Sequence, residues 1–295
     1  MELGAFNQHA WIYFIQRNIM WSTRSTGTLR IPPNLGDKHQ INFSLVATLL
    51  SSLVSRLGPS VGLYLALELV GKFVTPLNSN IDWVTPANLE YVIFGKILTL
   101  EAQTFRVYFL DCLFNAIYLM HPFYLMIVLL ILYKKDHVAS HHFSRATLIT
   151  CYIGFVVFLF YPVAPPWLAI KGVENTARTV VNNFSSSLKL PIGYDNFNPA
   201  VYAAIPSLHC ALAWTSTLCI RKLGKSYGLA MFLFTLGVWI GTVYTGNHFL
   251  IDIILGVALA TVTYRLTDSS NVFYRTIKRW QRIVTRRIFP HKRKP

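Results

Sequence analysis

Three short stretches of the sequence carry residues that could do chemistry together. They are Ala-Pro-Pro-Trp-Leu at 164–168, Pro-Ser-Leu-His at 206–209 and His-Phe-Leu-Ile-Asp at 248–252. Two histidines and a carboxylate lie at the ends of apolar segments, where ionisable groups are costly and usually serve a function. Because histidine can act as nucleophile, general acid or general base, the combination indicates phosphoryl transfer through a histidine.

His248 and Asp252 are four residues apart near the start of the last apolar segment. On one helix they would share a face, and the carboxylate could accept a proton from one ring nitrogen. The other nitrogen would then be free to act as nucleophile or base. Without a partner, Asp252 inside an apolar run would be costly. Taken alone, the pair could also be a structural His–Asp contact.

The spacing of the two histidines carries more information than either motif. His209 and His248 are 39 positions apart, which divide into one span, a basic turn and a second span. A span of about 18 residues covers about 27 Å, close to the hydrocarbon thickness of a bilayer. We therefore expect both histidines at the same face of the membrane.

The residues before His209 predict a helix that starts at Pro206, since proline suits the first helical position. Ile205 would be the N-cap, and it has no side-chain oxygen for the free backbone donors. The N–H groups of Ser207, Leu208 and His209 would then form an anion site suited to phosphate. An ordinary turn into a membrane helix is the alternative.

The composition is that of an integral membrane protein. Hydrophobic residues make up 53% of the chain, charged residues 13%, and the mean hydropathy is +0.42. We expect an all-α fold, a bundle of six transmembrane helices. The predicted spans are 57–76, 108–133, 146–164, 203–220, 228–246 and 249–266. Residues 41–55 are also apolar but short, so they could form an interfacial helix or extend the first span.

No linker or internal repeat divides the chain. We expect an N-terminal cytoplasmic or interfacial segment (1–56), a membrane catalytic domain (57–266) and a basic cytoplasmic tail (267–295). The start lacks the features of a signal peptide, so no cleavage is expected there.

The distribution of charge predicts the orientation. The net charge is +15, and ten Lys and Arg follow Tyr264 with Asp268 as the single acidic residue. Such a run beside a membrane helix marks the cytoplasmic side and contacts anionic lipid, in preference to nucleic acid. Short basic connections belong inside, so the long connections 77–106 and 165–202 should face outside. We therefore expect both termini in the cytoplasm and an extracytoplasmic active site, most simply in the cell membrane.

Other reactive side chains have less support. Asp111 could face an interior cavity near an outer helix end, and His121 is expected to be a hydrogen-bonded core residue. Three histidines in an inner loop suggest at most a weak metal site: His137, His141 and His142. The cysteines lie in apolar segments without metal-type spacing, so we expect structural burial. They are Cys112, Cys151, Cys210 and Cys219.

The motifs resemble those of the type 2 phosphatidic acid phosphatase superfamily. The resemblance covers roughly 105–266 and is carried by 164–168, 204–209 and 242–252. It is closest to the inositol phosphorylceramide synthase branch, known from the fungal target of aureobasidin A. The resemblance implies six helices, with His248 as nucleophile, Asp252 orienting it, and His209 as general acid and then base. It also implies no metal and no other cofactor.

Some positions depart from the wider superfamily. Its last motif begins with Ser-Arg, where this chain has Gly241 and Thr242, so a phosphate-binding arginine is missing. Lys171 and Arg178 keep the superfamily's Lys-x6-Arg spacing, and either phosphate binding or simple solvation could explain them. The Pro-Pro-Trp sequence and the missing arginine resemble the inositol phosphorylceramide branch. The expected substrate-binding residues are Ser207, Leu208, Lys171, Arg178, Pro166 and Trp167.

These features predict a membrane phosphotransferase. It would move a phosphoryl or phosphoalcohol group, such as inositol phosphate, from a lipid donor to an alcohol through a phosphohistidine. The alternative is a lipid phosphatase that uses water as acceptor. A transporter with a proton relay is less well supported, because no internal repeat or paired broken helices are evident. Substrates would be phospholipids or sphingolipid-like molecules.

Overall fold

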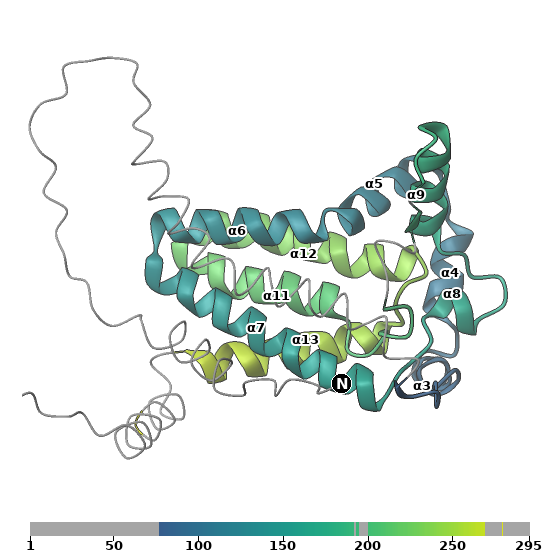
Figure 1. Cartoon of the computed structure of the whole chain (residues 1–295), viewed down its shortest axis with the longest axis horizontal. Helices are drawn as coiled ribbons and strands as arrows, with labels where there is room; N and C mark the ends of the chain where they lie inside the picture. The colour runs from purple at the N-terminus through teal and green to yellow at the C-terminus, as the bar shows by residue number, and fades with distance from the viewer. Residues whose placement is uncertain (1–76, 192, 195–199, 269–278, 280–295) are drawn as a thin grey trace, which may run out of the picture. The chain divides into compact units, whose positions relative to one another are not determined.

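The computed structural model describes residues 77–191, 193–194, 200–268 and 279. They belong to one compact unit, Tyr64–Pro295. The described residues form helices and loops (Figure 1), and β pairing among them is limited to two isolated bridges at Val163. The all-α prediction is therefore confirmed for this part of the chain. The three-part domain division stays a prediction, because 1–56 and nearly all of the tail lie outside these residues.

Among the described residues, six of the helices form a bundle (Figure 1). They are α5 (Tyr108–Leu119), α6 (His121–Lys135), α7 (His137–Phe160), α11 (Leu208–Ile220), α12 (Lys225–Tyr244) and α13 (Leu250–Thr267). α11 is the central helix, since it packs against α6, α7, α12 and α13. Most of its residues are buried.

Three of these helices, α7, α12 and α13, are long and apolar enough to cross a membrane. The bent pair α5–α6 makes a fourth candidate. The predicted spans at 228–246 and 249–266 correspond closely to α12 and α13. The predicted span 57–76 and the segment 41–55 lie outside the described residues. Several membrane-spanning helices are thus confirmed, and the total of six stays a prediction.

The expected span 108–133 is two helices instead of one. The axes of α5 and α6 are bent by 57° relative to each other. Pro122 is the second residue of α6. It has no N–H to donate to the carbonyl four residues earlier, so the backbone hydrogen-bond pattern of the helix is interrupted at this point.

α7 begins at His137, nine residues before the expected start at 146. Asp136 is its N-cap, and the carboxylate accepts a hydrogen bond from the Ala139 N–H at 2.9 Å. The cap accepts a hydrogen bond from a backbone N–H of the first turn, so the helix can include the polar residues that follow Asp136. His137, His141 and His142 therefore lie on a helix, and the prediction that they occupy an inner loop is wrong.

The short α11 ends in a basic turn. The turn contains the 3₁₀ helix η2 (Arg221–Leu223). Lys222 Nζ lies 3.1 Å from His142 Nδ1 and 3.7 Å from the carboxylate of Asp268. This turn therefore joins the far ends of α7, α11 and α13, at the opposite end of α11 from His209.

Four shorter helices gather at the end of the bundle where α11 begins and α12 ends (Figure 1). They are α3 (Thr85–Phe94), α4 (Leu98–Thr104), α8 (Pro166–Ala169) and α9 (Thr176–Ser187). Backbone hydrogen bonds tie α8 and α9 to the turn after α12: Trp167 N–H donates to the Gly246 carbonyl at 3.1 Å, and Thr176 N–H to the Thr245 carbonyl at 3.2 Å. On α4, the Gln103 side chain donates to the Tyr244 carbonyl at 3.0 Å. Both long connections therefore meet at the end that holds the histidines.

The cysteines are all free thiols. Cys151, Cys210 and Cys219 are buried, as expected, whereas Cys112 is exposed on α5. Burial was therefore the wrong prediction for Cys112, because an apolar helix in a membrane protein can also turn its side chains outward to lipid.

Candidate active site

His209 is the second residue of α11. Ser207 is the N-cap of this helix, and its Oγ accepts a hydrogen bond from the Cys210 N–H at 3.3 Å. The expected start at Pro206, with Ile205 as N-cap, is therefore wrong. A serine oxygen can satisfy a backbone donor of the first turn, which an isoleucine side chain cannot do.

The start of α11 offers fewer free donors than expected. The Ser207 N–H is already used, because it donates to the Asp252 carbonyl oxygen at 3.1 Å. Within the described part of the chain, the N–H groups of Leu208 and His209 have no acceptor. Two donors, instead of three, therefore remain at the positive end of this helix.

His248 lies in the turn between α12 and α13. Gly246 in this turn has a φ of 81°, and a Cβ there would collide with the carbonyl oxygen of Glu174. Glycine meets both requirements, since it adopts positive φ freely and has no Cβ. The N–H groups of Asn247 and His248 both donate to the Thr242 carbonyl at 3.1 Å. The turn is therefore tight, and it fixes the backbone of His248.

Asp252 is the partner of His248. Asp252 Oδ2 lies 3.3 Å from His248 Nδ1 and accepts a hydrogen bond from the Phe249 N–H at 2.9 Å. The Asp252 side chain is fully buried. Its other oxygen, Oδ1, is buried without a hydrogen-bond partner among the described residues. A buried carboxylate with one free oxygen can stabilise positive charge that develops on the imidazole.

The predicted contact between His248 and Asp252 is present, but the predicted geometry is wrong. α13 begins at Leu250, so His248 lies before the helix and the two side chains do not share a helix face. Asp252 is in the first turn, and it reaches back to the extended N-cap residue Phe249 as in half of a capping box. This return brings the carboxylate to the His248 ring.

The two histidines lie next to each other. Their ring centroids are 5.8 Å apart. On its other sides His209 is held by two rings from the bent helix pair: Tyr118 stacks on it at 4.5 Å, and His121 contacts it at 4.3 Å. His121 is buried and its Nδ1 lies 3.3 Å from Tyr124 Oη. The prediction that His121 is a hydrogen-bonded core residue is therefore confirmed. Its contact with His209 was not predicted.

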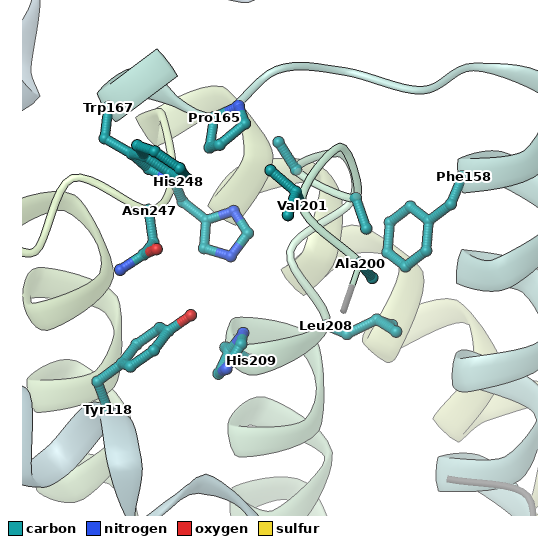
Figure 2. Close-up of a pocket in the computed structure, with 12 residues that line it drawn as sticks. Tyr118, Phe158, Pro165, Trp167, Ala200, Val201, Leu208, His209, Asn247 and His248 are labelled. Atoms are coloured by element: carbon teal, nitrogen blue, oxygen red, sulfur yellow. The ribbon is translucent and has the colours of Figure 1, made fainter. Parts of the chain in front are cut away.

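A cavity of about 80 Å³ opens between His209 and His248. Figure 2 shows the two imidazoles on facing sides of it. Tyr118, Asn247 and Trp167 line one flank, and Phe158, Leu208 and Val201 line the other. Ligand pockets for whole small molecules are usually about 300 Å³ or larger. This cavity therefore suits the reacting group of a substrate, with a polar flank and an apolar flank.

The structure separates the expected substrate-binding residues into two groups. Leu208 and Trp167 line the cavity, and the Arg178 guanidinium lies 5.3 Å from the centre of the Trp167 ring. Pro166 and Ser207 are buried outside the cavity lining, where they act at the starts of α8 and α11. Lys171 is exposed and does not line the cavity either.

Two polar side chains that line the cavity, Tyr118 and Asn247, were missing from the sequence-based set. Tyr118 comes from α5, and Asn247 directly precedes His248. Asn247 Oδ1 accepts hydrogen bonds at 3.2 Å from Tyr194 Oη and from Asn175 Nδ2. The position of Asn247 beside His248 was an available signal, whereas Tyr118 has no local motif that would have marked it.

Asp111 lies away from the cavity. Its carboxylate accepts a hydrogen bond from Tyr244 Oη at 2.7 Å and forms an ion pair with Arg106 at 3.2 Å. Arg106 in turn contacts the Glu174 carboxylate at 2.6 Å. These contacts join α5, α12 and the loop before α9, so the structure gives Asp111 a role in packing.

Burial also affects the protonation of the site. It lowers the pKa of the His248 imidazole to about 4, while a hydrogen bond to the Ala204 backbone acts in the opposite direction. The ring is therefore neutral at pH 7, the form in which a nitrogen can attack. In the part of the chain that the structure describes, no three His, Cys, Asp or Glu side chains are grouped so that they could hold a metal ion.

Comparison with known proteins identifies the family. The sequence pattern of the PAP2 superfamily matches residues 90–266. Phosphoinositol dihydroceramide synthase from Bacteroides thetaiotaomicron is 30% identical over 193 residues, which cover 59% of this chain and 63% of that protein. Inositol phosphorylceramide synthase from Candida albicans is 21% identical over 197 residues, which cover 62% of this chain and 41% of that protein.

The catalytic subunit aur1 of inositol phosphorylceramide synthase from Schizosaccharomyces pombe is 24% identical over 122 residues, 38% of this chain and 28% of that protein. The chain thus spans less than two thirds of the length of these relatives. The crystal structure of Aquifex aeolicus LpxE superimposes with a TM-score of 0.46 and 17% identity, covering 58% of this chain and 92% of that one. The family match extends over well more than half of the sequence and includes all three motifs, so the chain belongs to the PAP2 superfamily of membrane enzymes.

Proposed function

We propose that the protein transfers a phosphoinositol-type group from a lipid donor to the hydroxyl group of a ceramide-like acceptor. The main support is that His209 and His248 face one cavity with a polar and an apolar flank, while Asp252 contacts His248. The printed names of the relatives, which are inositol phosphorylceramide and phosphoinositol dihydroceramide synthases, favour this donor and acceptor.

The first half of the proposed reaction forms a phosphohistidine. The ring nitrogen of His248 that faces away from Asp252 attacks the phosphorus, and the bond between phosphorus and the lipid alkoxide breaks. His209 donates a proton to that alkoxide, so the donor leaves as a neutral diacyl alcohol. Asp252 stabilises the positive charge that His248 gains when the new bond forms.

The second half returns the enzyme to its starting state. The acceptor hydroxyl gives its proton to His209 and attacks the phosphorus, and the bond to His248 breaks. The N–H groups of Leu208 and His209 would hold the phosphate oxygens, with Arg178 beside Trp167 as the predicted cation. Every step uses groups of this chain alone, so we expect full activity in excess EDTA.

We further propose the six-helix topology of the superfamily, with the site at the extracytoplasmic face of the cell membrane and the basic tail against anionic cytoplasmic lipid. The short basic connections and the tail support this orientation.

Lipid mass spectrometry would test the function. Membranes with the wild-type protein should convert a phosphoinositol lipid and a ceramide to a phosphoinositol ceramide, and membranes with His248→Ala should not. Release of soluble inositol phosphate without a new lipid would identify a hydrolase instead. Proton-driven uptake without turnover would identify a transporter.

A further inference from the structure

α3 is an unusual helix, because its buried residues include a carboxylate while its large apolar residues are exposed. The buried residues are Pro86, Ala87 and Glu90. Glu90 has a relative exposure of 1%, whereas Val92 on the same helix is 81% exposed. Glutamate is rarely fully buried unless it is paired, so its contacts need an explanation.

The Glu90 carboxylate is shared between the starts of two other helices. Oε1 accepts a hydrogen bond from the Leu250 N–H at 2.8 Å, and Oε2 accepts one from the Leu98 N–H at 3.1 Å. Leu250 and Leu98 are the first residues of α13 and α4. The N–H groups at a helix start have no partner within their own helix, and the positive helix end favours a carboxylate.

One of these contacts lies next to the reacting histidine. Leu250 is two residues from His248, and the intervening Phe249 N–H donates to Asp252. Thr99, one residue after Leu98, also approaches this segment, with its Oγ1 3.4 Å from the His248 carbonyl oxygen. Two carboxylates and a hydroxyl thus hold three successive backbone positions, from His248 to Leu250.

Burial and the nearby Asp252 raise the pKa of the Glu90 carboxyl, while the hydrogen bonds from Leu250 and Leu98 oppose the shift. The side chain touches neither the cavity nor the reacting imidazoles. Its hydrogen bonds therefore reach the reacting residues through the backbone at the start of α13.

We propose that Glu90 is a positioning residue, which fixes the start of α13 and thereby holds His248 and Asp252 in line with His209. The inference rests on the proposed function, since it assigns His248 as the nucleophile. A misplacement of about 1 Å at a reacting group can lower the rate about 100-fold, so a residue with this role is expected to act on kcat.

Glu90→Gln is the first variant, because it keeps the shape of the side chain but places an NH₂ group against one of the two N–H donors. Leu250→Pro is the second. It removes the N–H group that donates a hydrogen bond to Glu90. Proline is tolerated here, because residue 250 is the first position of the helix and follows the extended Phe249. Glu101→Gln is the control, since Glu101 is an exposed carboxylate on α4 that pairs with Lys96.

The test uses the full chain in vesicles with a phosphoinositol lipid and a short-chain ceramide. We expect kcat to fall about 10-fold to 100-fold in Glu90→Gln and Leu250→Pro, with KM changed less than about twofold, and no change in Glu101→Gln. Unchanged kcat in both variants, or a rise in KM alone, would overturn the proposal.

Hydrogen exchange separates this inference from the proposed function. Amides of residues 248–254 should exchange faster in Glu90→Gln than in the wild type. Amides of α7 in Glu90→Gln, and amides of residues 248–254 in the Glu101→Gln control, should exchange as in the wild type. If the wild-type protein turns over none of these lipids, the proposed function fails. The exchange result still shows whether Glu90 fixes the start of α13. Equal exchange of 248–254 in wild type and Glu90→Gln would exclude the positioning role.

Discussion

At the scale of single residues, the proposed reaction requires His248 and His209 to have different tasks. His248 must form a bond to phosphorus in every cycle, whereas His209 moves protons. An acid is least needed when the leaving group is already stable as an anion. Substrates with good leaving groups should therefore separate the two histidines.

We predict that His209→Gln still releases about one equivalent of a good leaving group, such as nitrophenolate, and then stalls, because no base activates the second step. Steady turnover should fall by about 10²-fold to 10⁴-fold. His248→Ala should show no burst. Stopped-flow absorbance measures both phases, and His137→Gln, an exposed position near the start of α7, is the matched control. A normal burst in His248→Ala would contradict the assignment.

A second prediction concerns pH. Burial lowers the pKa of His248 to about 4, so the neutral, nucleophilic ring is present from about pH 5 upward. The rate of the burst with a good leaving group should therefore be nearly constant between pH 5 and 7, and should fall as the pH drops through about 4. An unperturbed histidine would instead lose activity near pH 6.5. A midpoint at that value in the pH profile would argue against a buried nucleophile.

The meeting of His209, His248 and Asp252 could be predicted from the sequence, because their spacing follows from the lengths of two spans and a turn. Tyr118 and Glu90 could not. Each acts through a partner far away in the chain, Tyr118 on His209 and Glu90 on Leu250. Such contacts depend on how helices pack, which hydrophobic periodicity does not specify.

At the scale of the helices, the site depends on close packing of α11 against α13. Gly256 on α13 lies against the backbone of Ser207, where a Cβ would be 2.5 Å from the carbonyl oxygen. Backbone cannot move aside as a side-chain tip can. The packing distance between the two helices is therefore set by the absence of a side chain at this position.

We predict that Gly256→Ala lowers the free energy of unfolding by about 1–3 kcal/mol and also reduces turnover, because α11 carries His209. Gly237→Ala is the control: its Cβ would meet only the tip of Ile117, at 3.0 Å. Thermal unfolding in detergent and kcat would be measured for both. If both variants behaved alike, this packing contact would not be important for the site.

Local signals explain which helix boundaries could be foreseen. Pro122 marks the break between α5 and α6, and Asp136 is a good N-cap for α7. The prediction used the apolar runs alone, and it was wrong at both boundaries. The bend of 57° itself has no counterpart in the sequence pattern, since it depends on how α6 packs against α7 and α11.

At the scale of the whole molecule, the two ends of the bundle differ in chemistry. The histidines and both long connections lie at one end, and the basic turn with Lys222 lies at the other. The excess of positive charge at the second end is typical of the cytoplasmic side.

We predict that a cysteine at Asn183 reacts with an impermeant maleimide added to intact cells, and that one at Ser226 does not. Both positions are exposed. The experiment needs a Cys112→Ser background, because Cys112 is also exposed while the other three cysteines are buried. Ser226 should become reactive once the cells are permeabilised. The reverse pattern in intact cells would place the histidines in the cytoplasm.

The two-sided lining of the cavity has a consequence for timing. In the proposed cycle the first product must diffuse away through the lipid before the acceptor arrives, so the phosphohistidine has to survive this interval. Phe158, Leu208 and Val201 shield one flank of the cavity, and His248 is only 5% exposed. For the proposed reaction we expect water to reach this site less readily than an acceptor lipid whose hydroxyl group enters along the apolar flank. In the proposed cycle, this shielding would slow attack by water on the phosphohistidine more than attack by an acceptor lipid, and would so raise the ratio of transfer to hydrolysis.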